Sequence, residues 1–420
     1  MKFRVYILVN RERGSIYGIG TYIEQLAACM KDGRIDFTIV NLYSDTSEIR
    51  YTESNGTKQL FIPKISLGIN QERYLHNVAY ILRDIIPQDD CLCVFHVNYL
   101  TSYHLVNCLK ELFRCKIVFT LHYTNWSFRY LGNYSFVKNL LSKPPEELKA
   151  DDRLSAMMIR SDKEMLKKCD RIICIADHSQ KYMTEIYEVP LAKTTVINNA
   201  LRDTYEETSE KEIQSIKTQL HLPLSTKVVI FAGRLEEVKG VSFLIKSFGQ
   251  VVKSHPNTHL FIAGDGNEMK KYLSEAYPCG TKITFTGFLD KERLYDLYKI
   301  ADIGIVCSLH EEFGFTAIEM MMMNIPLVVS DTTGLSEIVE DNCSGFKVPV
   351  IYRDGSPQLN TVMLSEKIRT LLDDPQTASR FKSNGRKKFI GKYNTLLWSR
   401  KMLELYRSLC ETESVCPTEG

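Results

Sequence analysis

Short runs of β-branched and other apolar residues recur along the chain, and stretches with helical spacing of their apolar positions separate them. This alternation of buried strands with helices is typical of parallel sheets built from strand–helix–strand units. In the first half the pattern predicts strands at 3–10, 37–43, 91–97, 116–123, 171–176 and 195–198. In the second half it predicts strands at 227–233, 259–264, 282–289, 303–308, 326–331 and 346–349. The pattern therefore predicts an α/β protein with two Rossmann-like, doubly wound domains.

The length of 420 residues also fits two domains. A polar, glutamate-rich stretch near residue 203 predicts the boundary, and the last residues have helical spacing but follow the final strand at a distance. We predict an N-terminal domain over 1–203, a C-terminal domain over 204–393, each binding one of two substrates, and a helix and tail over 394–420 that packs back on the first domain. Because open α/β sheets bind ligands at the carboxyl ends of their strands, we expect the two domains to face each other across a cleft.

Composition narrows the class of protein. Lys and Arg number 53 against 51 Asp and Glu, so the net charge of +2 gives no general reason to expect nucleic acid as a partner. The 12 cysteines lack metal-binding spacing and are interpreted as buried thiols in a reducing compartment. The sequence predicts no signal peptide, because Arg11 to Arg13 interrupt the first apolar run, and no run is long enough to span a bilayer. We therefore predict a cytoplasmic protein and leave open peripheral contact with the inner face of a membrane.

Gly18 and Gly20 follow the first predicted strand and open an amphipathic helix. Glycines at a helix N-terminus let the backbone approach an anion or a hydroxyl-rich ligand. Ile23 stands where the dinucleotide fingerprint has its third glycine, which argues against a nicotinamide cofactor. A turn that serves only the path of the chain is the alternative.

Arg234 and Lys239 follow the first strand of the second half, beside a glycine turn at a helix start. A planar guanidinium and an ammonium in this position suit a diphosphate. They could also replace a metal ion, since no two aspartates have the D-x-D spacing often used to hold a divalent cation on a sugar nucleotide. We therefore predict no metal and no cofactor. A solvated surface pair is the alternative.

Glu311 and Glu319 flank a loop that runs from a strand into a helix. Two carboxylates would repel a diphosphate, so we expect them to face hydroxyl groups while backbone N–H groups around Phe313 to Thr316 hold the phosphates. Helix capping is the alternative. It accounts for an acid in the loop but not for Glu319 on an otherwise apolar helix.

His122 ends another predicted strand and is a candidate for the mouth of the cleft, whereas His96, also at a strand end, is interpreted as structural. A single histidine more often has a structural role.

Together these loops resemble the retaining glycosyltransferases of family 4, which have the GT-B fold, and the resemblance covers nearly the whole chain. The motifs of the second half are the more specific ones. They are Phe231-Ala-Gly-Arg-Leu with Lys239-Gly, Ile262-Ala-Gly-Asp-Gly266, Phe285-Thr-Gly-Phe288, Ala301-Asp-Ile-Gly-Ile-Val-Cys-Ser, the segment Glu311 to Glu319, Ile325-Pro-Leu-Val-Val-Ser-Asp and Gly334-Leu-Ser-Glu337-Ile-Val.

The resemblance implies that the domain over 1–203 binds the acceptor and that the domain over 204–393 binds the donor. It also implies roles for the residues above. Arg234 and Lys239 would bind the donor diphosphate, Glu319 the ribose, and Glu311 the transferred sugar. His122 would act with Glu311, Arg234 and Lys239 in catalysis. The remaining implied donor contacts are Gly18, Gly20, Gly264, Phe288, Phe313, Gly314 and Phe315.

The resemblance implies a metal-independent transfer of a hexosyl group from a nucleoside diphosphate sugar, with UDP expected, to a glycan, lipid-linked or peptide acceptor in surface glycan biosynthesis. A catalytically silent sugar-nucleotide-binding partner protein and a sugar-nucleotide epimerase or phosphorylase remain alternatives. The aromatic and lysine-rich segment 123–166 could shape the acceptor site, touch a bilayer, or pack as an ordinary loop.

Overall fold

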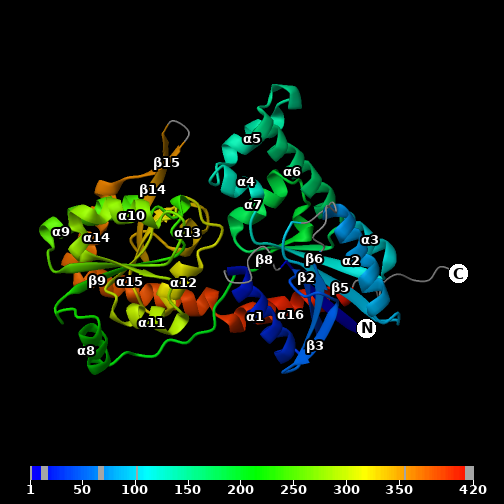
Figure 1. Cartoon of the computed structure of the whole chain (residues 1–420), viewed down its shortest axis with the longest axis horizontal. Helices are drawn as coiled ribbons and strands as arrows, with labels where there is room; N and C mark the ends of the chain where they lie inside the picture. Colours follow the sequence, from blue (N-terminus) through cyan, green and yellow to red (C-terminus); the bar gives the residue numbers. More distant parts are fainter. Residues whose placement is uncertain (1, 11–17, 65–70, 101–102, 354–355, 412–420) are drawn as a thin grey trace. The chain divides into compact units, whose positions relative to one another are not determined.

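The computed structural model describes residues 2–10, 18–64, 71–100, 103–353 and 356–411. The chain forms two compact units, the first made of Met1–Asn199 with Thr395–Gly420 and the second of Ala200–Asn394 (Figure 1). Both are α/β units, as the alternation of apolar runs predicts. Every predicted strand is present, with ends that differ by a few residues.

The first unit contains an eight-stranded sheet in the order β3-β4-β2-β1-β5-β6-β7-β8. All neighbouring strands are parallel except β3, which runs antiparallel to β4. The strands are β1 (Phe3–Asn10), β2 (Asp36–Ser44), β3 (Arg50–Ser54), β4 (Thr57–Pro63), β5 (Leu92–Val97), β6 (Cys115–Leu121), β7 (Arg171–Cys174) and β8 (Thr194–Val196). The helices are α1 (Gly18–Asp32), α2 (Gln71–Ile85), α3 (Tyr103–Leu112), α4 (Asn125–Arg129), α5 (Tyr134–Ser142), α6 (Ala150–Lys168), α7 (Asp177–Glu185) and α16 (Thr395–Glu411).

The C-terminal helix α16 belongs to this first unit and packs on α1, as Figure 1 shows. The Sγ of Cys29 lies 3.6 Å from the carbonyl oxygen of Ser399. A Cβ on Gly33, the residue that follows α1, would lie 2.4 Å from the Leu403 side chain, so α16 packs where this Cβ is missing. The buried Tyr406 also hydrogen-bonds His96. Helix α16 therefore completes the core of the first unit.

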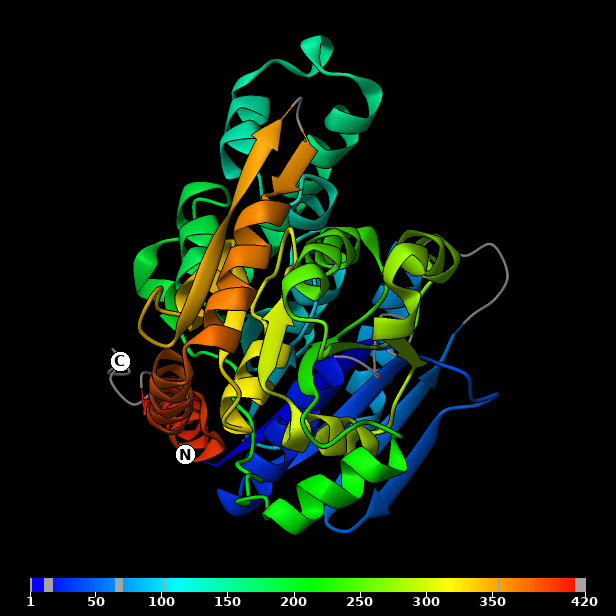
Figure 2. The same ribbon diagram turned by 90° about the vertical axis from the view of Figure 1, so that its left-hand side faces the viewer.

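The second unit contains a seven-stranded sheet in the order β11-β10-β9-β12-β13-β14-β15. Its neighbours are parallel except for the hairpin β14–β15, seen side by side as orange arrows in Figure 2. The strands are β9 (Lys227–Ala232), β10 (Thr258–Ala263), β11 (Ile283–Gly287), β12 (Ile303–Val306), β13 (Leu327–Asp331), β14 (Gly345–Arg353) and β15 (Ser356–Leu359). The helices are α8 (Glu210–Gln219), α9 (Val241–Ser254), α10 (Met269–Ala276), α11 (Lys291–Ile300), α12 (Phe315–Met322), α13 (Thr333–Ile338), α14 (Thr361–Asp373) and α15 (Pro375–Lys388).

The chain enters and leaves the second unit at one place. The amide of Leu201 donates to the carbonyl of Tyr393 at 2.8 Å, and Leu201 also forms a β-bridge with Asn394. Residues 200–394 are therefore an insertion whose two ends are hydrogen-bonded to each other.

Glycines meet where three neighbouring strands of the second unit end. The amide of Gly264 donates to the carbonyl of Gly287 at 2.9 Å. Gly264 has a φ of +150°, and a Cβ there would lie 1.8 Å from the carbonyl oxygen of Gly233. Packing alone therefore requires glycine at position 264. The donor contact predicted for this residue is not needed to explain the glycine and stays a prediction.

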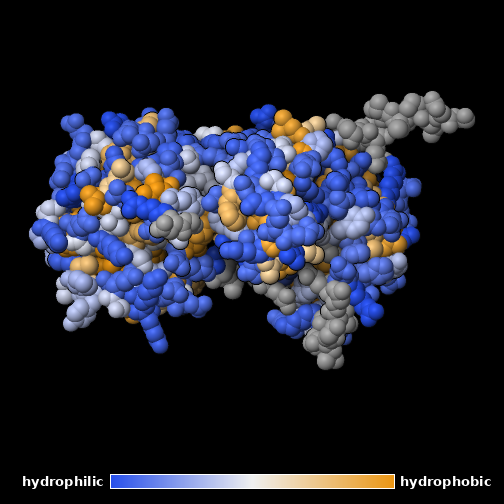
Figure 3. Space-filling model, turned by 90° about the horizontal axis from the view of Figure 1, so that it is seen from above, coloured by the Kyte–Doolittle hydropathy of each residue, from blue (hydrophilic) through white to orange (hydrophobic). Residues whose placement is uncertain are grey.

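None of the helices in the described part of the chain is long and apolar enough to cross a membrane. Figure 3 shows hydrophilic residues over most of the face it views, with hydrophobic residues scattered among them. The cysteines of the described residues are free thiols, and Cys91, Cys279 and Cys343 are partly exposed rather than buried as expected.

Candidate active site

Two loops of the second unit, after β9 and after β12, are bonded to each other through their backbones. The amide of Leu309 donates to the carbonyl of Val238 at 2.7 Å, and the Sγ of Cys307 lies 3.3 Å from the carbonyl oxygen of Lys239. Gly240 has a φ of +69°, and a Cβ there would lie 2.1 Å from the carbonyl oxygen of Cys307. Only glycine allows this approach, so the backbone fixes the spacing of the two loops.

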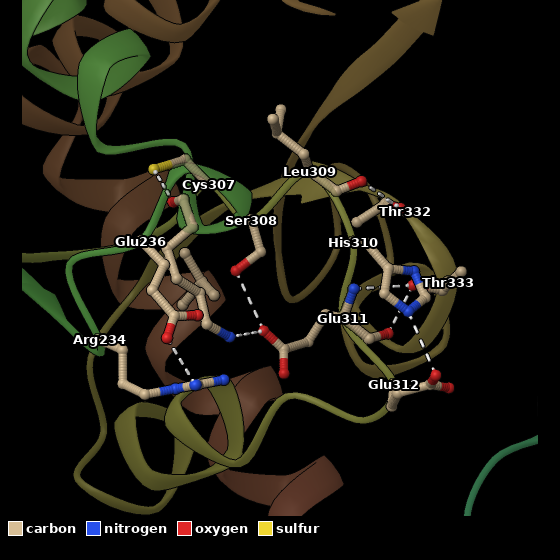
Figure 4. A network of polar contacts seen from close by, with 12 residues as sticks. Arg234, Glu236, Cys307, Ser308, Leu309, His310, Glu311, Glu312, Thr332 and Thr333 are labelled. Atoms are coloured by element: carbon tan, nitrogen blue, oxygen red, sulfur yellow. Dashed lines mark hydrogen bonds and ion pairs between the residues drawn. The ribbon is translucent and has the colours of Figure 1, made fainter. Parts of the chain in front are cut away.

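The side chains of the two loops meet at Glu311. The Nζ of Lys239 lies 2.6 Å from Oε2 of Glu311, and the Oγ of Ser308 donates to the same oxygen at 3.0 Å. Both charged side chains are about one-fifth exposed. In the view of Figure 4, Arg234 and Glu236 lie on one side of this carboxylate. The carboxylate holds the ammonium in place and balances its charge, so the structure brings together two of the residues predicted for catalysis.

Arg234 has a carboxylate partner that the sequence analysis did not foresee. Its Nη1 lies 2.6 Å from Oε1 of Glu236, and both side chains are about two-fifths exposed. An exposed pair of this kind contributes little stability, but it orients the guanidinium. The alternative of a solvated surface pair therefore fits Arg234, which is exposed, better than Lys239, which is largely buried.

The loop that carries Glu311 is held by the start of α13. The amide of Glu311 donates to Oγ1 of Thr333 at 3.1 Å, and the amide of Gly334 donates to the carbonyl of Glu311 at 2.9 Å. A Cβ on Gly334 would lie 2.4 Å from the carbonyl oxygen of Phe313. Thr333 and Gly334 thus fix the Glu311 backbone. Their signal in the sequence is the motif that begins at Gly334, which forms part of the family resemblance.

Helix α12 begins directly after this loop. Gly314 precedes it with a φ of +109°, a left-handed conformation that favours glycine. The Phe313 side chain is buried at 4% exposure and Phe315 is partly exposed. For Phe313, therefore, only the backbone could meet a ligand, which is the role the sequence analysis gave to this stretch.

Glu319 lies on α12 in an aromatic setting. Its Oε2 accepts a long hydrogen bond of 3.5 Å from the hydroxyl of Tyr298, and Tyr295 lies nearby. Burial raises the pKa of Glu319 to about 7, although Lys291 and Tyr298 act in the opposite direction. No hydrogen bond or ion pair among the described residues joins Glu319 to Glu311. The two predicted carboxylates therefore have different surroundings.

The raised pKa of Glu319 predicts a pH-dependent stability. In the unfolded chain this carboxyl has its ordinary pKa near 4.5, whereas the folded protein holds its proton up to about pH 7. The stability that this group contributes is therefore fully present below about pH 4.5 and is lost as the pH rises through about 7. Glu319→Gln removes this dependence. We expect the variant to gain on the order of 1–3 kcal/mol over the wild type between pH 5 and pH 8. Melting temperatures measured across that range test the prediction, and parallel curves for the two proteins would contradict it.

Phe288 follows β11, and its side chain is 72% exposed. The predicted contact of its backbone with the base stays a prediction.

The predicted residues of the first unit lie around α1. Gly18 and Gly20 occupy the first turn of α1, while the rest of the predicted loop, 11–17, lies outside the described residues. His122 comes directly after β6 and is buried at 8% exposure. Its Nε2 lies 3.3 Å from Oδ1 of Asn98, and its ring packs edge-on against Tyr22, 4.6 Å between centroids.

Burial lowers the pKa of His122 to about 3, so its imidazole is neutral at neutral pH. Fully buried His96 instead bonds Oγ1 of Thr120 at 2.7 Å and the hydroxyl of Tyr406, which fits its interpretation as structural.

Comparison with known protein families decides the identity of the fold. The family model described as "Glycosyltransferase Family 4" matches residues 16–204, and the model described as "Glycosyl transferases group 1" matches residues 212–388. The chain belongs to glycosyltransferase family 4. The two matches together cover most of both structural units, as the sequence resemblance predicted.

Curated relatives of this family 4 chain match over part of their length. An uncharacterised glycosyltransferase of Methanocaldococcus jannaschii is 31% identical over 183 residues, which are 42% of this chain and 46% of the relative. An α-D-kanosaminyltransferase of Streptomyces kanamyceticus is 22% identical over 59% of this chain and 63% of the relative. A glycogen synthase of Mycobacterium tuberculosis is 28% identical over 51% of this chain and 49% of the relative. The chain thus matches about half to two-thirds of each of these proteins.

Solved structures match over nearly the whole chain. Sucrose-phosphate synthase of Thermosynechococcus elongatus has a TM-score of 0.74 at 18% identity, with 98% of this chain and 100% of that chain covered. The HepE protein of Anabaena, solved with UDP and glucose, has a TM-score of 0.70 at 18% identity, with 97% and 100% covered. At this identity the likeness shows the fold, which for this family 4 protein is GT-B with two Rossmann-like domains.

Proposed function

We propose that this family 4 protein is a retaining glycosyltransferase that moves a hexosyl group from a nucleoside diphosphate sugar, with UDP as the preferred nucleotide, to a hydroxyl acceptor. The observation that carries the proposal is the Lys239–Glu311 pair, 2.6 Å apart and largely buried, in the loops that precede α9 and α12. The pair and the loop beside it combine a cation, a hydroxyl-binding carboxylate and backbone N–H groups at the carboxyl end of a parallel sheet. Nucleoside diphosphate sugars require these three kinds of group.

In the proposed reaction the bond between the anomeric carbon and the diphosphate oxygen breaks, and the acceptor oxygen bonds the same face of that carbon. The acceptor proton passes to the leaving diphosphate. Lys239 and Arg234 stabilise the negative charge that develops on the leaving group, and Glu311 binds hydroxyls of the transferred sugar. Glu319 binds the ribose, and the backbone at Phe288 contacts the base. No side chain of this chain serves as a nucleophile, and the two cations take the place of a metal ion.

His122 is proposed to orient a hydroxyl of the sugar or the acceptor. Its neutral imidazole can donate one hydrogen bond and accept another without adding charge. The contacts with Asn98 and Tyr22 hold the ring in one orientation. This arrangement favours positioning over proton transfer, because a base with so low a pKa retains little affinity for the proton at neutral pH.

The preference for UDP rests on the Anabaena relative, whose solved structures contain UDP and UDP-glucose. For the acceptor we propose a glycan, lipid-linked or peptide hydroxyl in surface glycan or polysaccharide synthesis. The glycogen synthase among the relatives supports the polysaccharide alternative. We also propose that the protein acts inside the cell. Peripheral contact with the membrane depends on whether the acceptor is linked to a lipid.

Calorimetry and thermal shift with UDP, GDP, ADP and their common sugars, each with and without Mg²⁺, test the proposal. Selective stabilisation by one nucleotide and its sugar without magnesium is expected, because a ligand that binds only the native state raises its stability by RT ln(1 + [L]/Kd). A lack of response to every nucleotide would overturn it. Donor binding without hydrolysis or transfer would indicate a silent binding protein. Product formed without acceptor, or only with inorganic phosphate, would indicate an epimerase or a phosphorylase.

A further inference from the structure

A cavity lies in the first unit, between α4 and α6. Its volume is about 230 Å³, and Asn125, Trp126, Arg129, Ser155 and Asp162 are among the residues that line it. Helix α4 begins three residues after His122, at the carboxyl end of β6, and contacts α6. Figure 1 shows the two helices in the same part of the unit. The cavity therefore belongs to the edge of the sheet where α/β units bind ligands.

Asp162 brings an uncompensated carboxyl group to this cavity. It is 9% exposed, and no Lys or Arg of the described residues forms an ion pair with it. The guanidinium at the cavity, Arg129, pairs with Asp151 instead, at 2.9 Å. Burial raises the pKa of the Asp162 carboxyl to about 7, and the neighbouring Tyr187 hydroxyl lowers it by less. Buried acids are normally paired, so this one favours a cationic ligand.

Trp126 adds a second group without a partner. The indole is 2% exposed, and its Nε1 has no hydrogen-bond partner among the described residues. Its ring packs edge-on against Tyr182 at 4.7 Å between centroids. A tryptophan ring attracts cations, while its N–H requires an acceptor such as a hydroxyl oxygen. Trp126 lines the cavity, and a ligand hydroxyl that reaches its buried N–H would supply the acceptor that this N–H lacks.

We propose that this cavity binds the ammonium group and a neighbouring hydroxyl of the acceptor, which is therefore an amino sugar or a glycan that ends in one. The inference rests on the proposed transferase function and names its acceptor class. The volume is below that of sites for drug-sized ligands, so it accommodates a single sugar ring or its amino-bearing edge. Asp162 supplies the counter-ion, and Trp126, Asn125 and Ser155 supply the neutral contacts. A neutral sugar leaves the carboxyl without a cation.

A lipid headgroup such as ethanolamine would offer the same ammonium. Leu154 and Met158 line the cavity and are 54% and 39% exposed, so a membrane source must be tested. Vesicles of phosphatidylethanolamine and of phosphatidylcholine, compared with free glucosamine, separate the two sources. Binding to phosphatidylethanolamine vesicles without binding of free glucosamine would overturn the amino-sugar acceptor.

Calorimetry of the full chain with glucosamine and with glucose tests the proposal. We expect glucosamine to bind at least tenfold more tightly than glucose, and Asp162→Asn to abolish that preference. Trp126→Phe is expected to weaken glucosamine binding several-fold. Glu164→Gln serves as the control, because Glu164 lies on the same helix but pairs with Lys167 at the surface. The control should bind glucosamine like the wild type.

Equal affinity for the two sugars, or a preference that survives Asp162→Asn in a variant with a normal melting curve, would overturn the inference. UDP is titrated in parallel. If UDP binds and glucosamine shows no preference, the amino-sugar inference fails while the proposed transferase stands. If UDP fails to bind and the preference persists, the proposed function fails and the cavity remains an ammonium site.

Discussion

Lys239→Met is expected to lower sugar transfer from the donor about 10²–10³-fold, the usual cost of removing one charge-stabilising group from an active site. The methionine keeps the length and apolar stem of lysine but offers no charge to the leaving diphosphate. It also leaves Glu311, which lies 2.6 Å from the ammonium, without its cation. Repulsion between that carboxylate and the diphosphate then adds to the loss. Transfer rates and UDP affinity, measured separately, show whether the loss falls on turnover, on binding, or on both.

Lys246→Met is the matched control for this prediction. Lys246 lies on α9, a few residues after the loop, and is exposed. The same change there should leave transfer within about twofold of the wild type, since isolated surface charges contribute little. Near-normal turnover of Lys239→Met with an authentic donor would contradict the proposed site.

Gly264→Ala is expected to destabilise the second unit by more than about 3 kcal/mol, or to prevent its folding. The added Cβ would lie 1.8 Å from the carbonyl oxygen of Gly233, so β9 and β10 must separate. The φ of +150° adds strain for any residue with a Cβ. Denaturant unfolding, followed by circular dichroism, measures the change.

Gly280→Ala controls for the loss of a glycine as such. A Cβ on Gly280 would meet no atom within 4 Å, so this variant should unfold within about 0.5 kcal/mol of the wild type. Equal stability of the two alanine variants would show that the sheet relaxes around position 264 without cost.

The sequence predicted the strands that carry a run of β-branched or other apolar residues, and it missed β3, β4 and β15, which belong to the two antiparallel hairpins. Strand β5 reads LCVFHV and is buried throughout, whereas β3 reads RYTES and has no buried residue. Strand β15, SPQL, is short and contains a proline. Strand β4 carries polar residues in its first half. Edge hairpins of this kind owe their formation to backbone pairing with a neighbour, which a hydrophobic pattern does not record.

The candidate site was predictable to the extent that its residues follow strands. Lys239 and Glu311 could be named because each lies in a loop after an apolar run, but their 2.6 Å contact joins residues 72 positions apart. The partners Glu236 and Thr333 depend on the path of the loops in space. Burial raises the pKa of Glu319, and its hydrogen-bond partner Tyr298 lies on another helix, α11, 21 positions earlier in the chain. Pairing and desolvation are tertiary properties, so the residue types alone do not reveal them.

The hydrogen bond between Leu201 and Tyr393 has a practical consequence for dividing the gene. A fragment that encodes residues 200–394 keeps every strand and helix of the second unit. Because the two ends of this insertion lie together, the same fragment can be exchanged between relatives with two adjacent fusion points. A fragment that stops at residue 199 does not leave an intact counterpart. It lacks α16 and uncovers the surface around Cys29 and Gly33 on which that helix packs, so the matching piece must splice residues 395–411 back after a short linker.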